Sequence, residues 1–318
     1  MTNTLNCIGR SIPRVGAREK VTGTALFSAD IELNAPLILK AFRSDRPHAE
    51  IVSIAVEKAL AIEGVAAVFT ARDVPGKNLT GIIVKDQPVL ATDKVRCIGD
   101  PVALVAAETE AAAERALKAI EVVYRDLPAV FDPEKAMSED TPRVHAKGNV
   151  MTTRAIRRGD PEEAFARCKS VIEKTYRTTF VEHNYIEPDA GAGFVDSDGT
   201  LVIYASTQNP HYDHKDVVTV LGLADEKVRI IQAATGGGFG SKLDLNVQGF
   251  IGLALYHLKR PVRYVYSREE AYLATAKRHP LVMRMKTGAD ENGRLLAMQA
   301  TIICDTGAYA SYGPAVAN

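Results

Sequence analysis

The sequence predicts an α+β protein in which short strands alternate with helices, and three observations support this. Of the 318 residues, 46% are apolar and 25% are charged, which is ordinary for a globular protein. The length is large for one domain and comfortable for two. Between about residues 20 and 130, the apolar segments twice follow the order strand, helix, strand, with irregular stretches between them.

The first predicted domain covers residues 1–130. A helix is expected at 53–62, because its apolar positions have helical spacing and Ser53 and Gly64 suit its two ends. A second helix is expected in the Ala-rich segment 109–120. Strands are expected at 36–42, 65–69, 101–107 and 121–124, of which the third is apolar throughout and should be buried.

A polar segment rich in Pro, Glu and Asp, residues 131–149, predicts a linker to a second domain at 150–318. Near the end of this domain, Asn292-Gly293 separates two extended runs and predicts a β-hairpin. The expected strands of the second domain are 171–180, 201–205, 228–231, 262–266, 281–286 and 295–304, and its expected helices are 211–221 and 247–258.

The run from Gly236 to Gly240 is the most informative motif, because four of its five residues are glycine. Bare backbone costs conformational entropy on folding, so such a run indicates close approach of something to the main chain. Between a strand and a helix, its N–H groups could face an oxyanion. The order Ser241-Lys242 does not match a nucleotide-phosphate loop, which argues against an NTPase. A turn that packs the strand on the helix is the alternative.

Composition limits the partners and the location that we expect. Lys plus Arg and Asp plus Glu both total 39, which argues against binding to nucleic acid. No apolar run approaches the roughly 20 residues that span a bilayer, so no membrane contact is expected. Residues 1–6 lack the features of a signal peptide, which favours a cytoplasmic protein.

The cysteines and histidines have no spacing typical of a metal or iron–sulfur site. If the protein uses a metal, we therefore do not expect Cys or His of this chain to hold it. Each thiol is expected to be reduced and buried. The cysteines are Cys7, Cys97, Cys168 and Cys304.

Several motifs occur along the chain in one order. The segments 16–30, 46–49 and 99–103 resemble the α/β hammerhead domain of the xanthine dehydrogenase and aldehyde oxidase family. The motifs at 182–188 and 206–210, together with the glycine run, are similar to the first part of the molybdenum-cofactor-binding domain of that family. Further matches are Ser267-Arg268-Glu269-Glu270, Arg278-His279-Pro280 and the segment 305–314, which resembles bacterial molybdopterin subunits of the nicotinate dehydrogenase type.

The resemblance implies a molybdenum hydroxylase. Molybdenum would be held by molybdopterin, in bacteria often as the cytosine dinucleotide form, and not by protein ligands. The implied reaction is hydroxylation of a small N-heteroaromatic molecule, nicotinate-like or purine-like, with water as the oxygen source. Electrons would leave through 2Fe-2S clusters to FAD, which partner subunits would carry. In such enzymes the cofactor performs the chemistry and the protein places it.

The resemblance also implies roles for individual residues. Gln208 would donate its neutral amide to a ligand of molybdenum, and the backbone of Gly238, Phe239 and Gly240 would meet the cofactor. Gln208 and Phe239 would therefore lie near the metal. The alternatives are a turn-forming Gln208 before Asn209 and a Phe239 that packs in the core.

Four other residues of the matched motifs allow two interpretations. We interpret His183 and Glu187 as structural. Lys242 and Arg278 could offset the charge of a phosphate or carboxylate, although such residues are more often solvated.

Two departures from the family pattern limit the interpretation. Xanthine dehydrogenases have Glu directly after the lysine, where this chain has Leu243, so a purine substrate is in doubt. Leu243 would contact a nicotinate-like ring, another heterocycle or an aldehyde. Asp244 comes one position late and would point elsewhere.

The second departure concerns the catalytic Glu of the family, a general base in a Gly-Glu-Pro-Pro motif, which does not occur in this sequence. We therefore expect no catalytic residue in this chain and expect a partner chain, or a C-terminal half, to supply the base. The alternatives are a non-catalytic fragment or assembly partner, or an aldehyde-oxidising member of the family.

Overall fold

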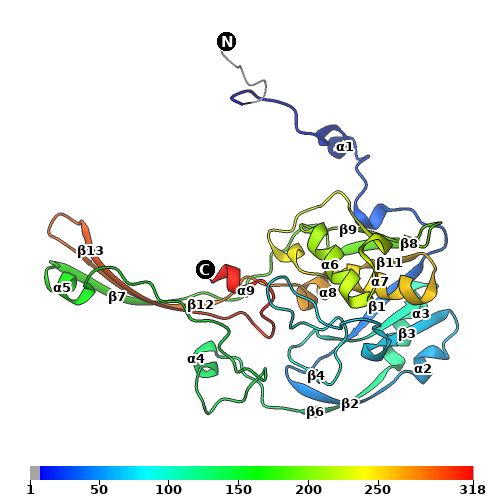
Figure 1. Cartoon of the computed structure of the whole chain (residues 1–318), viewed down its shortest axis with the longest axis horizontal. Coiled ribbons are helices and arrows are strands. Elements are labelled where there is room, and N and C mark those ends of the chain that lie inside the picture. The colour runs from blue at the N-terminus through cyan, green and yellow to red at the C-terminus, as the bar shows by residue number, and fades with distance from the viewer. Residues whose placement is uncertain (1–7, 318) are drawn as a thin grey trace.

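A seven-stranded mixed sheet organises the body of the molecule in the computed structural model, which describes residues 8–317 (Figure 1). Its strand order is β10-β9-β8-β11-β1-β5-β3. Strands β1 and β11 run parallel, and this pair joins the half of the sheet before the expected linker to the half after it. The strands are β1 (Leu37–Arg43), β3 (Val65–Thr70), β5 (Pro101–Ala107), β8 (Ala190–Val195), β9 (Leu201–Ala205), β10 (Val228–Gln232) and β11 (Val262–Val265).

Helix α3 (Glu110–Ala119) packs on the sheet near β1 and β5, as the Ala-rich segment predicts. Thr109 begins this helix, and its Oγ1 accepts a hydrogen bond from the backbone N of Ala112 at 3.1 Å. The small side chains of the helix allow close contact with the equally small residues of β5. This layer consists mainly of Ala103, Val105, Ala107, Ala112, Ala113 and Ala116.

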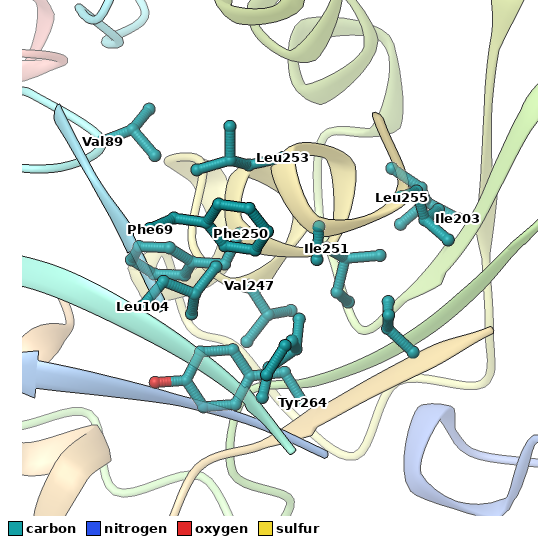
Figure 2. Close-up of a cluster of buried hydrophobic side chains, with 14 of the residues drawn as sticks. Phe69, Val89, Leu104, Ile203, Val247, Phe250, Ile251, Leu253, Leu255 and Tyr264 are labelled. Atoms are coloured by element: carbon teal, nitrogen blue, oxygen red, sulfur yellow. The ribbon is translucent and has the colours of Figure 1, made fainter. Parts of the chain in front are cut away.

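Helices α6 (Pro210–Leu221) and α7 (Val247–Leu258) pack against each other and against the other half of the sheet. Figure 2 shows Phe250, Ile251 and Leu253 of α7 among side chains from the strands, including Leu104 and Tyr264. Nine consecutive residues of α7 are buried, which explains the nearly continuous apolar sequence of this helix. Both helices confirm the sequence-based expectation.

The expected helix at 53–62 is mostly wrong. Residues Ala49–Ala55 form strand β2, which pairs with β6 (Glu121–Asp126) and β4 (Lys94–Val95) in a separate antiparallel sheet. Only Glu57–Leu60 is helical, as α2. The β-branched residues of β2 favour extended backbone, and pairing with a strand about 70 positions away outweighs the helical spacing.

Strand β8 escaped prediction because glycine alternates with alanine in it, which gives a weak strand signal. The structure gives these glycines a reason. A Cβ on Gly191 would lie 2.6 Å from Cδ1 of Ile251, so the bare strand lets α7 pack closely on the sheet. Helix α8 (Arg268–Ala274), which begins at Ser267, was likewise not predicted.

A three-stranded antiparallel sheet projects from the body as a long arm (Figure 1). It consists of β7 (Ser170–Arg177), β12 (Leu281–Ala289) and β13 (Leu295–Cys304), with β12 in the middle. The β12–β13 hairpin confirms the Asn-Gly prediction. Helices α4 (Pro133–Ala136), which lies within the expected linker, and α5 (Pro161–Ala166) accompany the arm, and α1 (Ala17–Val21) and α9 (Gly313–Val316) lie near the two ends of the chain.

The cysteines differ from the expectation in their burial. Cys97, Cys168 and Cys304 are free thiols, as expected, but each is only partly buried. Cys7 and the start of the chain, on which the expected cytoplasmic location rested, lie outside the described residues. Between residues 8 and 317, none of the helices is both long enough and apolar enough to cross a membrane.

Candidate functional site

The glycine run forms a loop between β10 and α7, followed by a single 3-10 turn, η4 (Ser241–Leu243). The strand–loop–helix order predicted from the sequence is therefore confirmed. Phe239 lies at φ 52°, in the left-handed region that non-glycine residues rarely adopt. Its side chain is 73% exposed, so the core-packing alternative for this ring is wrong. A strained backbone that carries an exposed aromatic ring indicates a functional surface.

Gln208 lies directly against this loop. Its Oε1 accepts a hydrogen bond from the backbone N of Gly240 at 2.9 Å, and its own backbone N donates to the carbonyl of Lys242. A Cβ on Gly238 would lie 2.4 Å from Gln208 Oε1, so glycine is needed there for this approach. Because Oε1 is the acceptor, Nε2 is a donor, and within residues 8–317 no hydrogen bond uses it.

The backbone of the loop offers further donors beside this amide. Across the described part of the chain, the N–H groups of Gly237, Gly238 and Phe239 have no hydrogen-bond acceptor. Backbone N–H groups are obligatory donors, so a run of three without partners is unusual. Together with Gln208 Nε2, the loop presents a neutral set of donors, which suits the oxygen atoms and ring nitrogens of a pterin cofactor.

A single carboxylate oxygen fixes the loop from beneath. Oε2 of Glu187 accepts hydrogen bonds from the backbone N of Gly236 at 2.7 Å, from Ser206 Oγ at 2.6 Å and from Lys242 Nζ at 2.9 Å. These three partners belong to the start of the loop, to the segment that carries Gln208, and to the turn after the loop. Glu187 thus joins three stretches of chain, as its structural interpretation predicts.

Lys242 does not act as a solvent-facing cation. Its side chain is fully buried, and Nζ contacts Glu187, Ser206 Oγ at 2.6 Å and the ring of Tyr185 at 4.5 Å. The expectation that Lys242 offsets ligand charge or is solvated is therefore wrong, because its charge is already balanced by Glu187. Arg278, by contrast, is exposed, and its backbone N pairs with the carbonyl of Val181.

A second buried acid lies next to this ion pair. Tyr185 Oη donates to Asp189 Oδ2 at 2.5 Å, and Asn246 Nδ2 donates to Asp189 Oδ1 at 2.8 Å. Burial raises the pKa of Asp189, and burial together with the Asp189 charge raises the pKa of Tyr185. The network links the segment before β8 to the residue that precedes α7, so it holds the base of the site rigid.

Three buried polar atoms of the segment 182–187 have no partner in the described part of the chain. They are Glu182 Oε1, His183 Nδ1 and Glu187 Oε1. Buried polar atoms are nearly always hydrogen-bonded in a complete native site. Since His183 and Glu187 lie beside the loop, their free atoms fit a site that a bound group or further polypeptide completes. If Gly240 carried a Cβ, that atom would lie 3.9 Å from Nε2 of His183.

The two residues after Lys242 differ in their surroundings. Leu243 is partly buried in the turn η4, directly after the loop. Asp244 accepts a hydrogen bond from Ser311 Oγ, and burial raises the pKa of its carboxyl. Since Asp244 is already engaged by Ser311, it does not replace the missing purine-contacting Glu. No cluster of His, Cys, Asp or Glu that could bind a metal ion occurs among residues 8–317.

Sequence reasoning located the loop and Gln208 but missed the buried support beneath them. Tyr185 and Ser206 lie within the matched motifs 182–188 and 206–210, but no role was expected of them, and Asp189 lies just outside these motifs. The Lys242–Glu187 pair, separated by 55 positions, helps to bring these segments together, as do the hydrogen bonds of Glu187 to Ser206 and of Asn246 to Asp189.

Comparison with known proteins identifies both parts of the chain. Residues 22–128 match the α/β hammerhead domain of aldehyde oxidase and xanthine dehydrogenase, and residues 143–318 match the molybdopterin cofactor-binding domain. The nicotinate dehydrogenase large molybdopterin subunit of Eubacterium barkeri is 49% identical over 309 residues, which cover 97% of this chain and 73% of that subunit.

Other relatives are considerably longer than the chain. A probable xanthine dehydrogenase subunit of Bacillus subtilis is 42% identical over 95% of this chain, which spans 41% of that protein. The solved aldehyde oxidoreductase of Desulfovibrio gigas superposes with a TM-score of 0.91 at 30% identity, covering 96% of this chain and 35% of the enzyme. The chain therefore belongs to the xanthine dehydrogenase and aldehyde oxidase family of molybdenum hydroxylases, and it carries a molybdopterin cofactor-binding domain.

Proposed function

We propose that the chain is the cofactor-binding subunit of an enzyme that hydroxylates an N-heteroaromatic, nicotinate-like molecule with water as the oxygen source. The observation that carries the proposal is the donor set at the glycine loop, where Gln208 Nε2 and three backbone N–H groups have no partner within residues 8–317. The similarity to a nicotinate dehydrogenase subunit supports the substrate class.

The residues of the loop would bind and orient the cofactor. Gln208 donates its amide to it, and Gly238 and Gly240 let the main chain approach it without steric clash. Phe239 presents its ring to the bound group and excludes water from one side. The bound molybdopterin supplies the redox chemistry, in the cytosine dinucleotide form that we propose for this chain.

Leu243 bears on the choice of substrate. An apolar side chain next to the loop cannot hydrogen-bond a purine, but it can pack on a pyridine ring. Nicotinate-like rings are therefore favoured over xanthine. The likeness to an aldehyde oxidoreductase makes an aldehyde the second candidate.

The remaining parts of the enzyme would come from partners. A second molybdopterin-binding polypeptide would supply the general base and the rest of the cofactor site, because no residue of the described site is placed as a base. Subunits with 2Fe-2S clusters and FAD would accept the electrons. We propose a cytoplasmic location for this complex and no contact with nucleic acid or membrane.

The experiment is to co-express the chain with the reading frames adjacent to its own and to measure molybdenum, pterin and hydroxylation of nicotinate, xanthine and an aldehyde. We expect bound molybdenum and turnover of nicotinate. A folded complex without molybdenum and pterin would overturn the proposal, and turnover of aldehyde alone would establish the second candidate instead. Cofactor without turnover of any substrate would establish a non-catalytic binding or assembly role.

Two variants test the donor set itself. Gln208→Ala removes the amide, and Gly238→Ala displaces it, since the new Cβ would meet Oε1. Loss of one good hydrogen bond to a charged group should lower cofactor occupancy about tenfold in each variant. Gln299→Ala, an exposed glutamine of the arm, is the matched control and should keep full occupancy. Circular dichroism checks that all three variants remain folded.

A further inference from the structure

The arm has two faces of opposite character, which its register defines. Residues opposite one another on neighbouring strands share a face, as do alternate residues along one strand. One face, here named the apolar face, consists of Ile172, Lys174 and Tyr176 of β7, Met283, Met285 and Thr287 of β12, and Met298, Ala300 and Ile302 of β13.

The apolar face is open to solvent. Ile172 is 60% exposed, Tyr176 50%, Met298 59% and Ile302 56%, and all four lie on the outer strands. Such a continuous apolar surface on three strands is unusual for a soluble protein. Met and Tyr are also enriched at the centres of protein interfaces.

The opposite face of the arm is the more polar of the two, and α4 and α5 cover only part of it. Val282, Gly288 and Ala297 are buried there, whereas Thr175, Gln299 and Thr301 are exposed. Glu134 of α4 forms ion pairs with Arg177 of β7 and Arg284 of β12. Cys168, which follows α5, packs against Gly288 of β12. A Cβ on Gly288 would lie 2.4 Å from the Sγ of Cys168. Antiparallel sheets normally bury the apolar face and expose the polar one. Here Tyr176, Met298 and Ile302 are exposed instead, which indicates that a further layer covers the apolar face.

We propose that the apolar face is the docking surface for the polypeptide that completes the molybdopterin-binding domain. This rests on the proposed function, in which a partner supplies the rest of the cofactor site. The length of the relatives favours this occupant. The chain spans 41% of the Bacillus subtilis protein and 35% of the Desulfovibrio gigas enzyme, so more than half of each lies outside the matched region. In those proteins the additional residues are joined to the matched region in one chain.

Charge disfavours a second copy of this chain as the occupant. Lys174 lies in the middle of β7 on the apolar face, and within residues 8–317 it has no ion-pair partner. Two copies stacked face to face would bring two such lysines into one desolvated interface, where like charges repel. The partner surface should instead be apolar, with one Asp or Glu opposite Lys174.

The test uses the complex obtained by co-expression with the adjacent reading frames, and the partner is identified by mass spectrometry. Ile302→Lys places a charge on the apolar face and should weaken the complex at least about tenfold. Gln299→Lys adds the same charge to the same strand on the opposite face, and the complex should keep wild-type affinity. Both positions are exposed, so both variants should fold.

The outcomes separate this inference from the proposed function, because molybdenum content is measured on the same samples. Loss of the partner in Ile302→Lys alone supports the docking surface, even if the wild-type complex lacks molybdenum. Equal binding by both variants overturns it. A wild-type chain that forms homodimers sensitive to Ile302→Lys also overturns it, as does a chain that binds molybdopterin without any second polypeptide.

Discussion

The seven-stranded sheet and the three-stranded arm are built from similar strands, but they differ in how they are covered. All seven residues of β5 are buried between helices, whereas all eight residues of β7 are exposed. The body therefore contains its own hydrophobic core, and the arm exposes an apolar face of the kind that other sheets bury. A sheet without a second layer depends on a partner for the stability that the body already has.

The cofactor loop resembles the body, because the residues that support it are buried. Its supports, Glu187 and Lys242, are nearly or fully buried, with side chains 11% and 0% exposed. The loop is exposed at Phe239, and Gln208 beside it is exposed as well. An exposed loop on a rigid, buried base is the arrangement expected of a binding site. Substitutions in the body should therefore change the free energy of unfolding more than matched substitutions in the arm.

The largest effect is expected at the buried ion pair. Lys242→Met leaves the Glu187 carboxylate buried without its cation, which should lower the free energy of unfolding by about 3–5 kcal/mol. Urea unfolding of the isolated chain measures it. Lys174→Met on the exposed arm is the control and should change stability by less than about 0.5 kcal/mol. Equal effects would mean that the ion pair does not support the loop.

Core truncation should separate the two sheets directly. Leu104→Ala removes a fully buried side chain from β5 and should cost about 2–5 kcal/mol. Ile302→Ala, on the open face of the arm, should cost less than about 1 kcal/mol in the isolated chain. In the complex, the cost of Ile302→Ala should rise if the arm is covered. Thermal unfolding of each variant, with and without the partner, measures the stability cost of Leu104→Ala and of Ile302→Ala.

A pH dependence is expected from Asp213 of α6, which is buried in the body. Burial raises the pKa of Asp213 to about 7, from an ordinary value of 3.8. Because the folded state disfavours the charged form, the contribution of Asp213 to stability is fully present only below its ordinary pKa of 3.8 and is lost as the pH rises through about 7. One pKa unit corresponds to about 1.4 kcal/mol, so Asp213→Asn should be more stable than wild type by about 2–4 kcal/mol at pH 8.

The Asp213→Asn variant should resemble the wild type at about pH 3 and below, where the aspartate is largely protonated in both the folded and the unfolded state. Asn retains an oxygen that can accept the hydrogen bond from Gln248 Nε2, which is 3.0 Å long in the structure. Glu173→Gln, an exposed carboxylate of the arm, is the control and should not alter the pH profile. A parallel loss of stability with pH in wild type and Asp213→Asn would contradict the assignment.

The smallest effect concerns a local contact. Thr109→Ala removes the N-cap of α3, and the free energy of unfolding should fall by about 1 kcal/mol. Thr109→Ser retains the hydroxyl and should restore most of that loss. Differential scanning calorimetry can resolve the two variants. A larger loss in Thr109→Ala than in Leu104→Ala would show that local capping outweighs core packing here.

The sequence predicted the elements that depend on local signals. The Ala-rich helix α3 and the Asn-Gly hairpin formed as expected. The expected helix at 53–62 was mostly wrong: its first residues belong to β2, because their helical spacing is a local property and the pairing of β2 with β6 is not. At the site, the motifs located Gln208 and the glycine loop, whose roles toward the cofactor stay predictions.

The sequence by itself determined the family, the glycine loop and the order of most strands and helices, because these follow from short motifs and hydrophobic periodicity. Only the tertiary structure decided three other features. Lys242 is a buried partner of Glu187 and not a free cation, the body shares one sheet across both halves of the chain, and the apolar face of the arm is open. Each depends on residues tens of positions apart, whose contacts no local pattern encodes.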